Sequence, residues 1–191
     1  MEILAINGSP RKSGNTSTLI KAVLEGAESA GAKTTEAYLH GLNMKGCMGC
    51  LSCRKDHGVC AQKDDLSPYL EAVKTCHGLI VGCPIYMYRI SGQMKLFIDR
   101  AYSLYMPRQG GGYSSAVPQG KTFAMVISHG APDPEQYHRS IRWLVGMAGK
   151  GHGMKEVGRI IHSNSHEMPA AKNKELLEQA HVLGRVLAGK E

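Results

Sequence analysis

The chain has 191 residues, of which 42% are hydrophobic and 20% are charged, and this length and composition fit one folded domain with a full core. The net charge of +7 comes from 23 Lys and Arg residues that are scattered along the chain, so we expect a solvated basic surface with one patch for an acidic donor or anionic cofactor, and no nucleic-acid partner. No segment has the pattern of a signal peptide or a membrane span, so we expect a cytoplasmic protein with no membrane partner.

Strand-like and helix-like segments alternate along the whole chain. The expected strands cover residues 3–6, 34–40, 78–83, 121–128 and 156–163, with Pro84 ending the third. Residues 78–83 are a continuous apolar run, whereas residues 34–40 alternate in polarity. The expected helices have apolar residues at helical spacing and cover residues 18–30, 66–76, 91–105, 140–148 and 170–188. Residues 109–115 are expected to form a flexible glycine-rich loop. The alternation predicts an α/β fold of one domain, residues 1–191, with a doubly wound parallel sheet, helices on both faces and a cysteine-rich insertion at about residues 44–64.

The segment Gly8–Thr16 joins the first strand to the first helix. It combines small residues, hydroxyl groups and the two cations Arg11 and Lys12, as an anion-binding loop at a helix N-terminus requires. It lacks both the Gly-Lys-Ser/Thr ending of nucleoside triphosphatases and the three-glycine dinucleotide fingerprint. A polar turn that merely caps the helix would have a similar composition. The segment resembles the Gly-Ser-Pro-Arg…Gly-Asn-Thr loop of the flavodoxin-like NADPH-dependent FMN reductase family, where this loop holds the flavin phosphate.

A second segment, Cys83–Arg100, resembles the other signature of that family, Pro-x-Tyr followed by a small residue and Lys-x-Phe-x-Asp-Arg. The resemblance implies five parallel strands in the order 2-1-3-4-5, with FMN at the strand ends where the loops after strands one, three and four converge. His129, in the third of these loops, is expected to be solvated. Lys95, Asp99 and Arg100 are expected to hold the third helix or a subunit interface. The resemblance implies an FMN site of Ser9, Arg11, Ser13, Gly14, Asn15, Thr16, Pro84, Ile85, Tyr86, Met87, Ser128 and Gly130.

Four cysteines, Cys47, Cys50, Cys53 and Cys60, follow the spacing C-x2-C-x2-C-x6-C. Four thiolates so close in sequence can surround one metal centre. The spacing resembles that of the iron–sulfur flavoproteins, which implies that these cysteines hold a [4Fe-4S] cluster beside FMN. Structural zinc, or free or redox-paired thiols as in cluster-free members of the wider family, are the alternatives.

The other potential ligands near this segment have simpler expected roles. His57 is expected to be exposed and not a ligand, and Cys76 and Cys83 are expected to be small apolar core residues.

The predicted function is that of an FMN-dependent oxidoreductase that passes electrons between ferredoxin or NAD(P)H, a [4Fe-4S] cluster, FMN and a small oxidant. No side chain is assigned as an acid–base catalyst. The alternatives are a cluster-free NAD(P)H-dependent FMN or quinone reductase and a non-enzymatic zinc or thiol sensor on the same fold. The resemblance and the apolar residues Met48, Leu51 and Val59 in the cysteine segment predict a homodimer or a homotetramer.

Overall fold

A computed structural model describes residues 1–55 and 58–190, and its centre is a parallel sheet in the order β2-β1-β3-β7-β8. This order confirms the predicted flavodoxin-like arrangement of five parallel strands. The five strands are β1 (Glu2–Asn7), β2 (Lys33–Tyr38), β3 (Gly78–Tyr86), β7 (Thr122–Ser128) and β8 (Lys155–His162). His57, which the sequence analysis expects to be exposed and not a ligand, lies outside the described residues.

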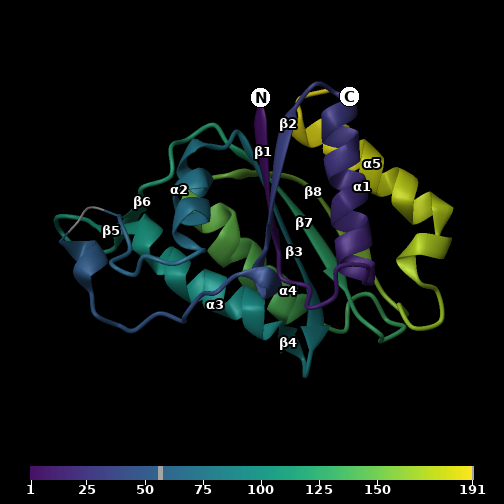
Figure 1. Ribbon diagram of the computed structural model, residues 1–191, viewed down its shortest axis with the longest axis horizontal. Coiled ribbons are helices and arrows are strands. Elements are labelled where there is room, and N and C mark those ends of the chain that lie inside the picture. Colours follow the sequence, from purple (N-terminus) through teal and green to yellow (C-terminus); the bar gives the residue numbers. More distant parts are fainter. Residues whose placement is uncertain (56–57, 191) are drawn as a thin grey trace.

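Helices cover both faces of the sheet, as Figure 1 shows, with α1 and α5 on one side and α2, α3 and α4 on the other. The α-helices are α1 (Asn15–Ser29), α2 (Ser67–Thr75), α3 (Gly92–Ala101), α4 (His138–Ala148) and α5 (Lys174–Leu187). Short 3-10 helices lie at Leu39–Gly41, Ser52–Arg54, Tyr102–Leu104, Lys150–His152 and Ala170–Lys172. None of the helices in the described part of the chain is long and apolar enough to cross a membrane.

Alternation along the strands supplies a core on each face of the sheet. In β1, Leu4 and Ile6 pack with the α2, α3 and α4 side, whereas Ile3 and Ala5 pack with the α1 and α5 side. β3 is buried from Gly78 to Ile85, which explains its continuous apolar sequence. The two cores therefore hold the loops at the carboxyl ends of β1, β3 and β7 on a rigid support.

Helices α1 and α5 approach each other through glycine. A Cβ atom added at Gly26 would overlap the carbonyl oxygen of His181, and one added at Gly184 would overlap the carbonyl oxygen of Val23. Only residues without a side chain allow the two backbones to pack at this distance.

Two sequence predictions about loops are wrong. β3 does not end at Pro84 but continues to Tyr86. Its pairing with β7 ends at Pro84, but the chain then turns back, and Ile85 and Tyr86 pair with the return strand β4 (Arg89–Ile90). Residues 109–115 are not a loop throughout, because β6 (Tyr113–Ser115) pairs antiparallel with β5 (Tyr105–Pro107). The glycines at 110–112 all have positive φ and form the tip of this hairpin.

Candidate functional site

The loop between β1 and α1 is folded by its own polar side chains. Asn7 Oδ1 accepts a hydrogen bond from the Ser9 N–H at 2.9 Å, and Asn7 Nδ2 donates to Ser17 Oγ at 3.0 Å. The hydroxyls of Ser9 and Ser17 both donate to the carbonyl oxygen of Arg11, at 3.0 and 2.8 Å. These bonds hold the loop around the start of α1. The sequence analysis did not include Asn7 in the site, although Asn7 is a polar residue at the end of an apolar strand.

The N-terminus of α1 is open to an anion. Its N-cap is Gly14, which supplies no side-chain acceptor, and the first turn contains no acidic residue. Arg11, Lys12 and Ser13 are exposed beside it, whereas Gly14 and Thr16 are buried. Free N–H groups at a helix start favour a phosphate, and the exposed cations add attraction. The loop therefore fits the phosphate of FMN.

Hydrogen bonds tie the three predicted loops together. Ser91, which caps α3, donates from its hydroxyl to the carbonyl oxygen of Gly8 at 2.6 Å. The hydroxyls of Thr16 and Ser128 lie 2.6 Å apart and join the first loop to the end of β7. Asn15 Nδ2 donates to the carbonyl oxygen of Ser165 at 3.0 Å, so its amide holds the segment after β8. The convergence expected at the carboxyl edge of the sheet is thus present.

The second loop is a tight hairpin turn between β3 and β4. Pro84 and Ile85 lie inside β3 and are buried, whereas Tyr86 is half-exposed and Met87 is 91% exposed. Met87 and Tyr88 have φ values of 45° and 65°, a backbone conformation that costs energy for residues other than glycine. The turn therefore presents two aromatic side chains, those of Tyr86 and Tyr88, and the Met87 thioether to solvent at the same edge of the sheet as the anion-binding loop, where they fit a flat ring system.

The third loop corrects the prediction for His129. This side chain is 3% exposed, packs edge-on against the Tyr137 ring at 4.9 Å and is not solvated. Burial lowers the pKa of His129, and within residues 1–55 and 58–190 neither ring nitrogen has a hydrogen-bond partner. Gly130 is small for a packing reason, because an added Cβ would overlap the His166 ring.

The four cysteines of the motif line one cavity of about 100 Å³ between the cysteine segment and α3. Cys47 and Cys50 are exposed and Cys53 and Cys60 are half-buried, all as free thiols. Among the described residues no three ligand-type side chains are gathered around a single metal ion. A [4Fe-4S] cluster needs one thiolate for each iron, so its ligands surround a volume and do not meet at a point. A cavity lined by all four of these cysteine residues fits such a cluster.

Arg100 anchors the cysteine segment to α3, a role that the sequence analysis missed. Its side chain is fully buried and pairs with Asp64 at 2.7 Å. Its Nε donates to Cys60 Sγ at 3.2 Å, and Nη1 donates to the carbonyl oxygen of Lys45 at 3.0 Å. Lys95 and Asp99, in contrast, form an exposed ion pair with each other on α3.

The remaining cysteines are buried, as expected. Burial raises the pKa of the Cys76 thiol to about 11 and that of the Cys83 thiol to about 12. Neither thiol is therefore ionised at neutral pH, and neither lines the cysteine cavity.

Sheet order, an open anion-binding loop and the aromatic turn define a flavodoxin-like fold with a candidate flavin site. The chain belongs to the NADPH-dependent FMN reductase family, a family of flavin-dependent oxidoreductases whose sequence model matches residues 1–161.

The curated relatives include iron–sulfur flavoproteins. One from Methanocaldococcus jannaschii is 35% identical over 104 residues, which are 54% of this chain and 53% of that protein. One from Archaeoglobus fulgidus is 28% identical over 189 residues, which are 98% of this chain and 79% of that protein. The chain thus spans only about half the length of the first of these relatives.

Solved structures show the same fold. The NAD(P)H:quinone oxidoreductase of Methanothermobacter marburgensis has a TM-score of 0.76 at 16% identity, covering 98% of this chain and 96% of that one. A flavodoxin from the Archaea has a TM-score of 0.57 at 19% identity, covering 99% of this chain and 97% of that one.

Proposed function

We propose that this protein is an FMN-dependent redox flavoprotein that passes electrons between ferredoxin or NAD(P)H, a [4Fe-4S] cluster on Cys47, Cys50, Cys53 and Cys60, FMN and a small oxidant. The observation that supports it best is the pairing of two sites on one chain. The first site is the N-terminus of α1, which has no side-chain cap and lies where the loops after β1, β3 and β7 meet. The second site is a separate cavity lined by all four motif cysteines. The names of the curated relatives agree with this combination.

At the flavin site, the chain's own residues bind and orient the cofactor. The α1 N-terminus, Arg11 and Ser13 would hold the phosphate, and Thr16 and Ser128 would keep the loops at the correct separation. Tyr86 and Met87 would cover the ring and exclude water. When bound, FMN exchanges either one or two electrons, so it can connect hydride donors with one-electron carriers.

At the cysteine cavity, Arg100 would stabilise Cys60 as the thiolate that binds the cluster. A guanidinium that donates to a thiolate sulfur compensates part of its negative charge. The same side chain keeps Lys45 and Asp64, on either side of the four cysteines in the sequence, against α3. The cavity wall is therefore held in place without the metal centre.

The second candidate is a cluster-free NAD(P)H-dependent FMN or quinone reductase. The exposure of Cys47 and Cys50 favours it, because exposed thiols can also act as free or redox-paired groups. A zinc sensor would require four sulfurs around a single ion, whereas a thiol sensor would require only reactive free thiols.

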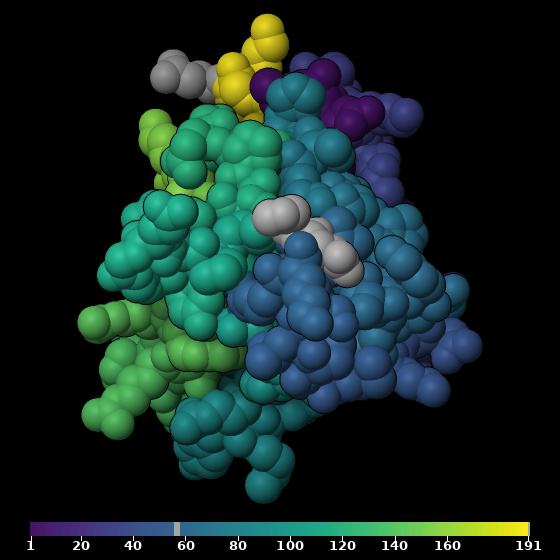
Figure 2. All heavy atoms as spheres, turned by 90° about the vertical axis from the view of Figure 1, so that its left-hand side faces the viewer, coloured from purple at the N-terminus to yellow at the C-terminus, as the bar shows by residue number. Residues whose placement is uncertain are grey.

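We also propose a homodimer or a homotetramer. Figure 2 shows one face on which the cysteine segment, in blue, lies beside the β5–β6 hairpin and α4, in green shades. Met48 and Leu51, 64% and 56% exposed, belong to this cysteine segment, and Trp143 and Met147 on α4 are also exposed. Exposed apolar residues in this number favour contact with another protein surface. Light scattering at micromolar concentration that finds only a monomer would contradict this proposal.

The cluster is tested by measuring iron, acid-labile sulfide and flavin per chain on protein prepared without oxygen. We expect about four iron and four sulfide per chain. A Cys50→Ser, Cys53→Ser variant should lose them and keep FMN, whereas the control Cys76→Ala should keep both. Flavin with neither iron nor sulfide would select the cluster-free reductase, and zinc without flavin would select the sensor.

The flavin site is tested with a charge at the loop. Ser13 is exposed, so Ser13→Glu places a carboxylate beside the α1 N-terminus without a packing change. We expect at least a tenfold loss of FMN affinity and little change for riboflavin, which lacks the phosphate. The matched control is Ser13→Ala. Equal losses for FMN and riboflavin would refute the assigned phosphate position.

A further inference from the structure

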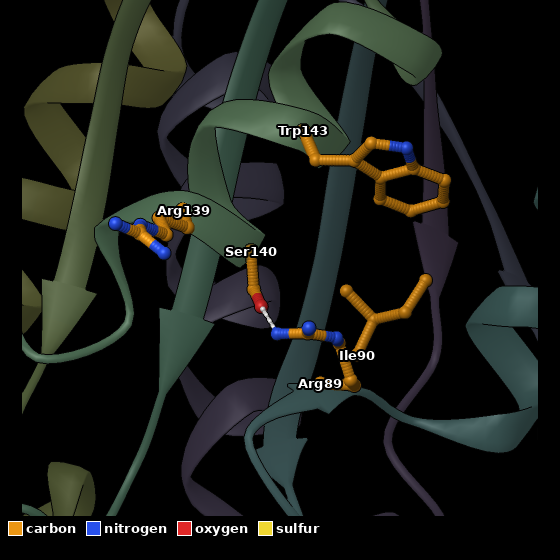
Figure 3. Close-up of a pocket in the computed structure, with 5 residues that line it drawn as sticks. All are labelled: Arg89, Ile90, Arg139, Ser140 and Trp143. Carbon is orange, nitrogen blue, oxygen red and sulfur yellow. Dashed lines mark hydrogen bonds between the residues drawn. The ribbon is translucent and has the colours of Figure 1, made fainter.

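A second pocket, separate from the anion-binding loop, lies between the β3–β4 hairpin and α4. It has a volume of about 340 Å³ and is lined by Arg89, Ile90, Arg139, Ser140 and Trp143 (Figure 3). This volume lies within the range of sites for small organic ligands and is too small for a protein element. The sequence analysis did not assign any of these residues to a site.

Arg89 has donors left for a ligand. Its Nη1 donates to Ser140 Oγ at 3.1 Å and to the Tyr88 carbonyl oxygen at 3.2 Å, and Ser140 Oγ donates to that same carbonyl at 2.8 Å. Within residues 1–55 and 58–190, neither Nε nor Nη2 of Arg89 has a hydrogen-bond partner. A guanidinium has five N–H donors in a fixed plane, so those of Nε and Nη2 remain available to an oxyanion.

The charge of the pocket is uncompensated. In the described part of the chain, neither Arg89 nor Arg139 forms an ion pair, and no carboxylate lines the pocket. Figure 3 shows the Arg139 side chain on the far side of Ser140 from Trp143 and Ile90, so the Arg89 guanidinium lies closer to these two side chains than that of Arg139 does. An anion is the ligand that this charge favours.

The opposite wall is flat and apolar. In Figure 3 the indole of Trp143 lies above Ile90, and Trp143 is 41% exposed. A planar aromatic ring buries apolar area against such an indole face. Trp143 also borders a hollow of about 410 Å³ that Cys47 and Asp99 line. The Asp99 carboxylate is already paired with Lys95, whereas Arg89 has no carboxylate partner in the described part of the chain, so the negative group belongs on the Arg89 side.

We propose that this pocket binds an anionic aromatic molecule, with its ring against Trp143 and its carboxylate, sulfonate or phosphate on Arg89. Because Arg89 and Ser140 both contact the Tyr88 carbonyl, the ligand lies next to the turn that presents Tyr86 and Met87. As a substrate site the assignment rests on the proposed function. A quinone bound there would gain a hydride from the reduced FMN of that function and one proton from solvent, and would leave as the hydroquinone with the FMN returned to its oxidised form.

The test uses anthraquinone-2-sulfonate, which does not alkylate thiols, and the neutral 2-(hydroxymethyl)anthraquinone as its matched control. Trp143 is the only tryptophan in the chain, so quenching of its fluorescence reports binding in both FMN-free and FMN-loaded protein. We expect the sulfonate to bind at least tenfold more tightly than the neutral compound, as a charge-assisted hydrogen bond predicts.

Variants separate the charge from the fold. Arg89→Gln should abolish the preference for the anion, Arg89→Lys should retain most of it, and Arg139→Gln should reduce it by less than threefold. Ser140→Ala removes the hydroxyl that contacts Arg89 and the Tyr88 carbonyl oxygen. This variant should still prefer the anionic compound, because the charge of Arg89 remains. Equal affinity of wild-type protein for the two compounds, or an unchanged preference in Arg89→Gln, would overturn the assignment.

The two proposals fail in different ways. If Ser13→Glu weakens the binding of FMN but not of riboflavin, and the wild-type protein shows no preference for the sulfonate, the pocket assignment is wrong and the proposed function stands. If the sulfonate binds through Arg89 but FMN does not bind, the proposed function is wrong and the pocket remains an anion site.

Discussion

Arg100→Gln removes the buried cation that joins α3 to the cysteine segment. The Arg100 side chain is fully buried and its partner Asp64 is 16% exposed. The substitution leaves the Asp64 carboxylate with the backbone N–H groups of Lys45 and Leu66 and the Ser67 hydroxyl as its remaining donors. Removing one member of a buried ion pair costs about 3 to 5 kcal/mol, and these remaining donors place this case at about 3 kcal/mol. For a chain of this length that corresponds to a decrease in Tm of about 6 to 12 °C.

The assay is urea unfolding, followed by the fluorescence of Trp143 and by circular dichroism. The matched control is Lys95→Gln, which removes an exposed ion pair on the same helix and should cost less than about 0.5 kcal/mol. A double-mutant cycle with Asp64→Asn should give a coupling energy of about 2 kcal/mol. A loss below about 1 kcal/mol for Arg100→Gln, or additive effects in the cycle, would refute the reasoning.

The pH dependence supplies an independent check. Burial by itself raises the pKa of Asp64, but the hydrogen bonds from Arg100 and the Lys45 N–H outweigh it and hold the pKa below its ordinary value. Because the folded-state pKa is lowered, the ion pair contributes fully above the ordinary carboxyl pKa of about 4 and is lost as the pH falls through the lowered value. The stability difference between wild-type protein and Arg100→Gln should therefore shrink below about pH 4.

Two further predictions concern the core. Burial lowers the pKa of His152 to about 4, so between about pH 6.5 and pH 4 the unfolded chain binds a proton at this histidine and the folded chain does not. As the pH falls through this window, the free energy of unfolding of wild-type protein should decrease by up to about 3 kcal/mol. In the same urea titrations His152→Gln should lack this decrease. Gly26→Ala should destabilise the protein by more than about 3 kcal/mol, because its Cβ meets the backbone of α5. Gly146→Ala on α4 has nothing within 4 Å of the added Cβ and should stabilise it by about 0.5 kcal/mol. Calorimetric scans that rank the two alanine variants in the opposite order would contradict this account of the α1–α5 contact.

The predicted sheet order, which rests on the resemblance to the flavodoxin-like family, is correct. The alternation of strands and helices by itself predicts only the parallel, doubly wound sheet. The three ligand loops also lie where strand ends converge, joined by Ser91 and Thr16. These features depend on patterns that are local in sequence, such as continuous apolar runs and residues suited to turns. The sequence analysis did not predict that β3 extends past Pro84. The partner of this extension is β4, a strand of two residues that is too short to show a periodic pattern.

By itself the sequence determined the fold, the position of the candidate flavin loops and the four cysteines that share a cavity. Only the tertiary structure decided that Arg100 anchors the cysteine segment, that His129 is buried and that Arg89 and Trp143 line one pocket. Each of these depends on side chains that are far apart in sequence: Arg100 reaches Asp64, 36 residues away, and Arg89 reaches Ser140, 51 residues away. Burial and hydrogen bonding between such residues depend on how packed elements meet, and no local spacing in the sequence contains that information.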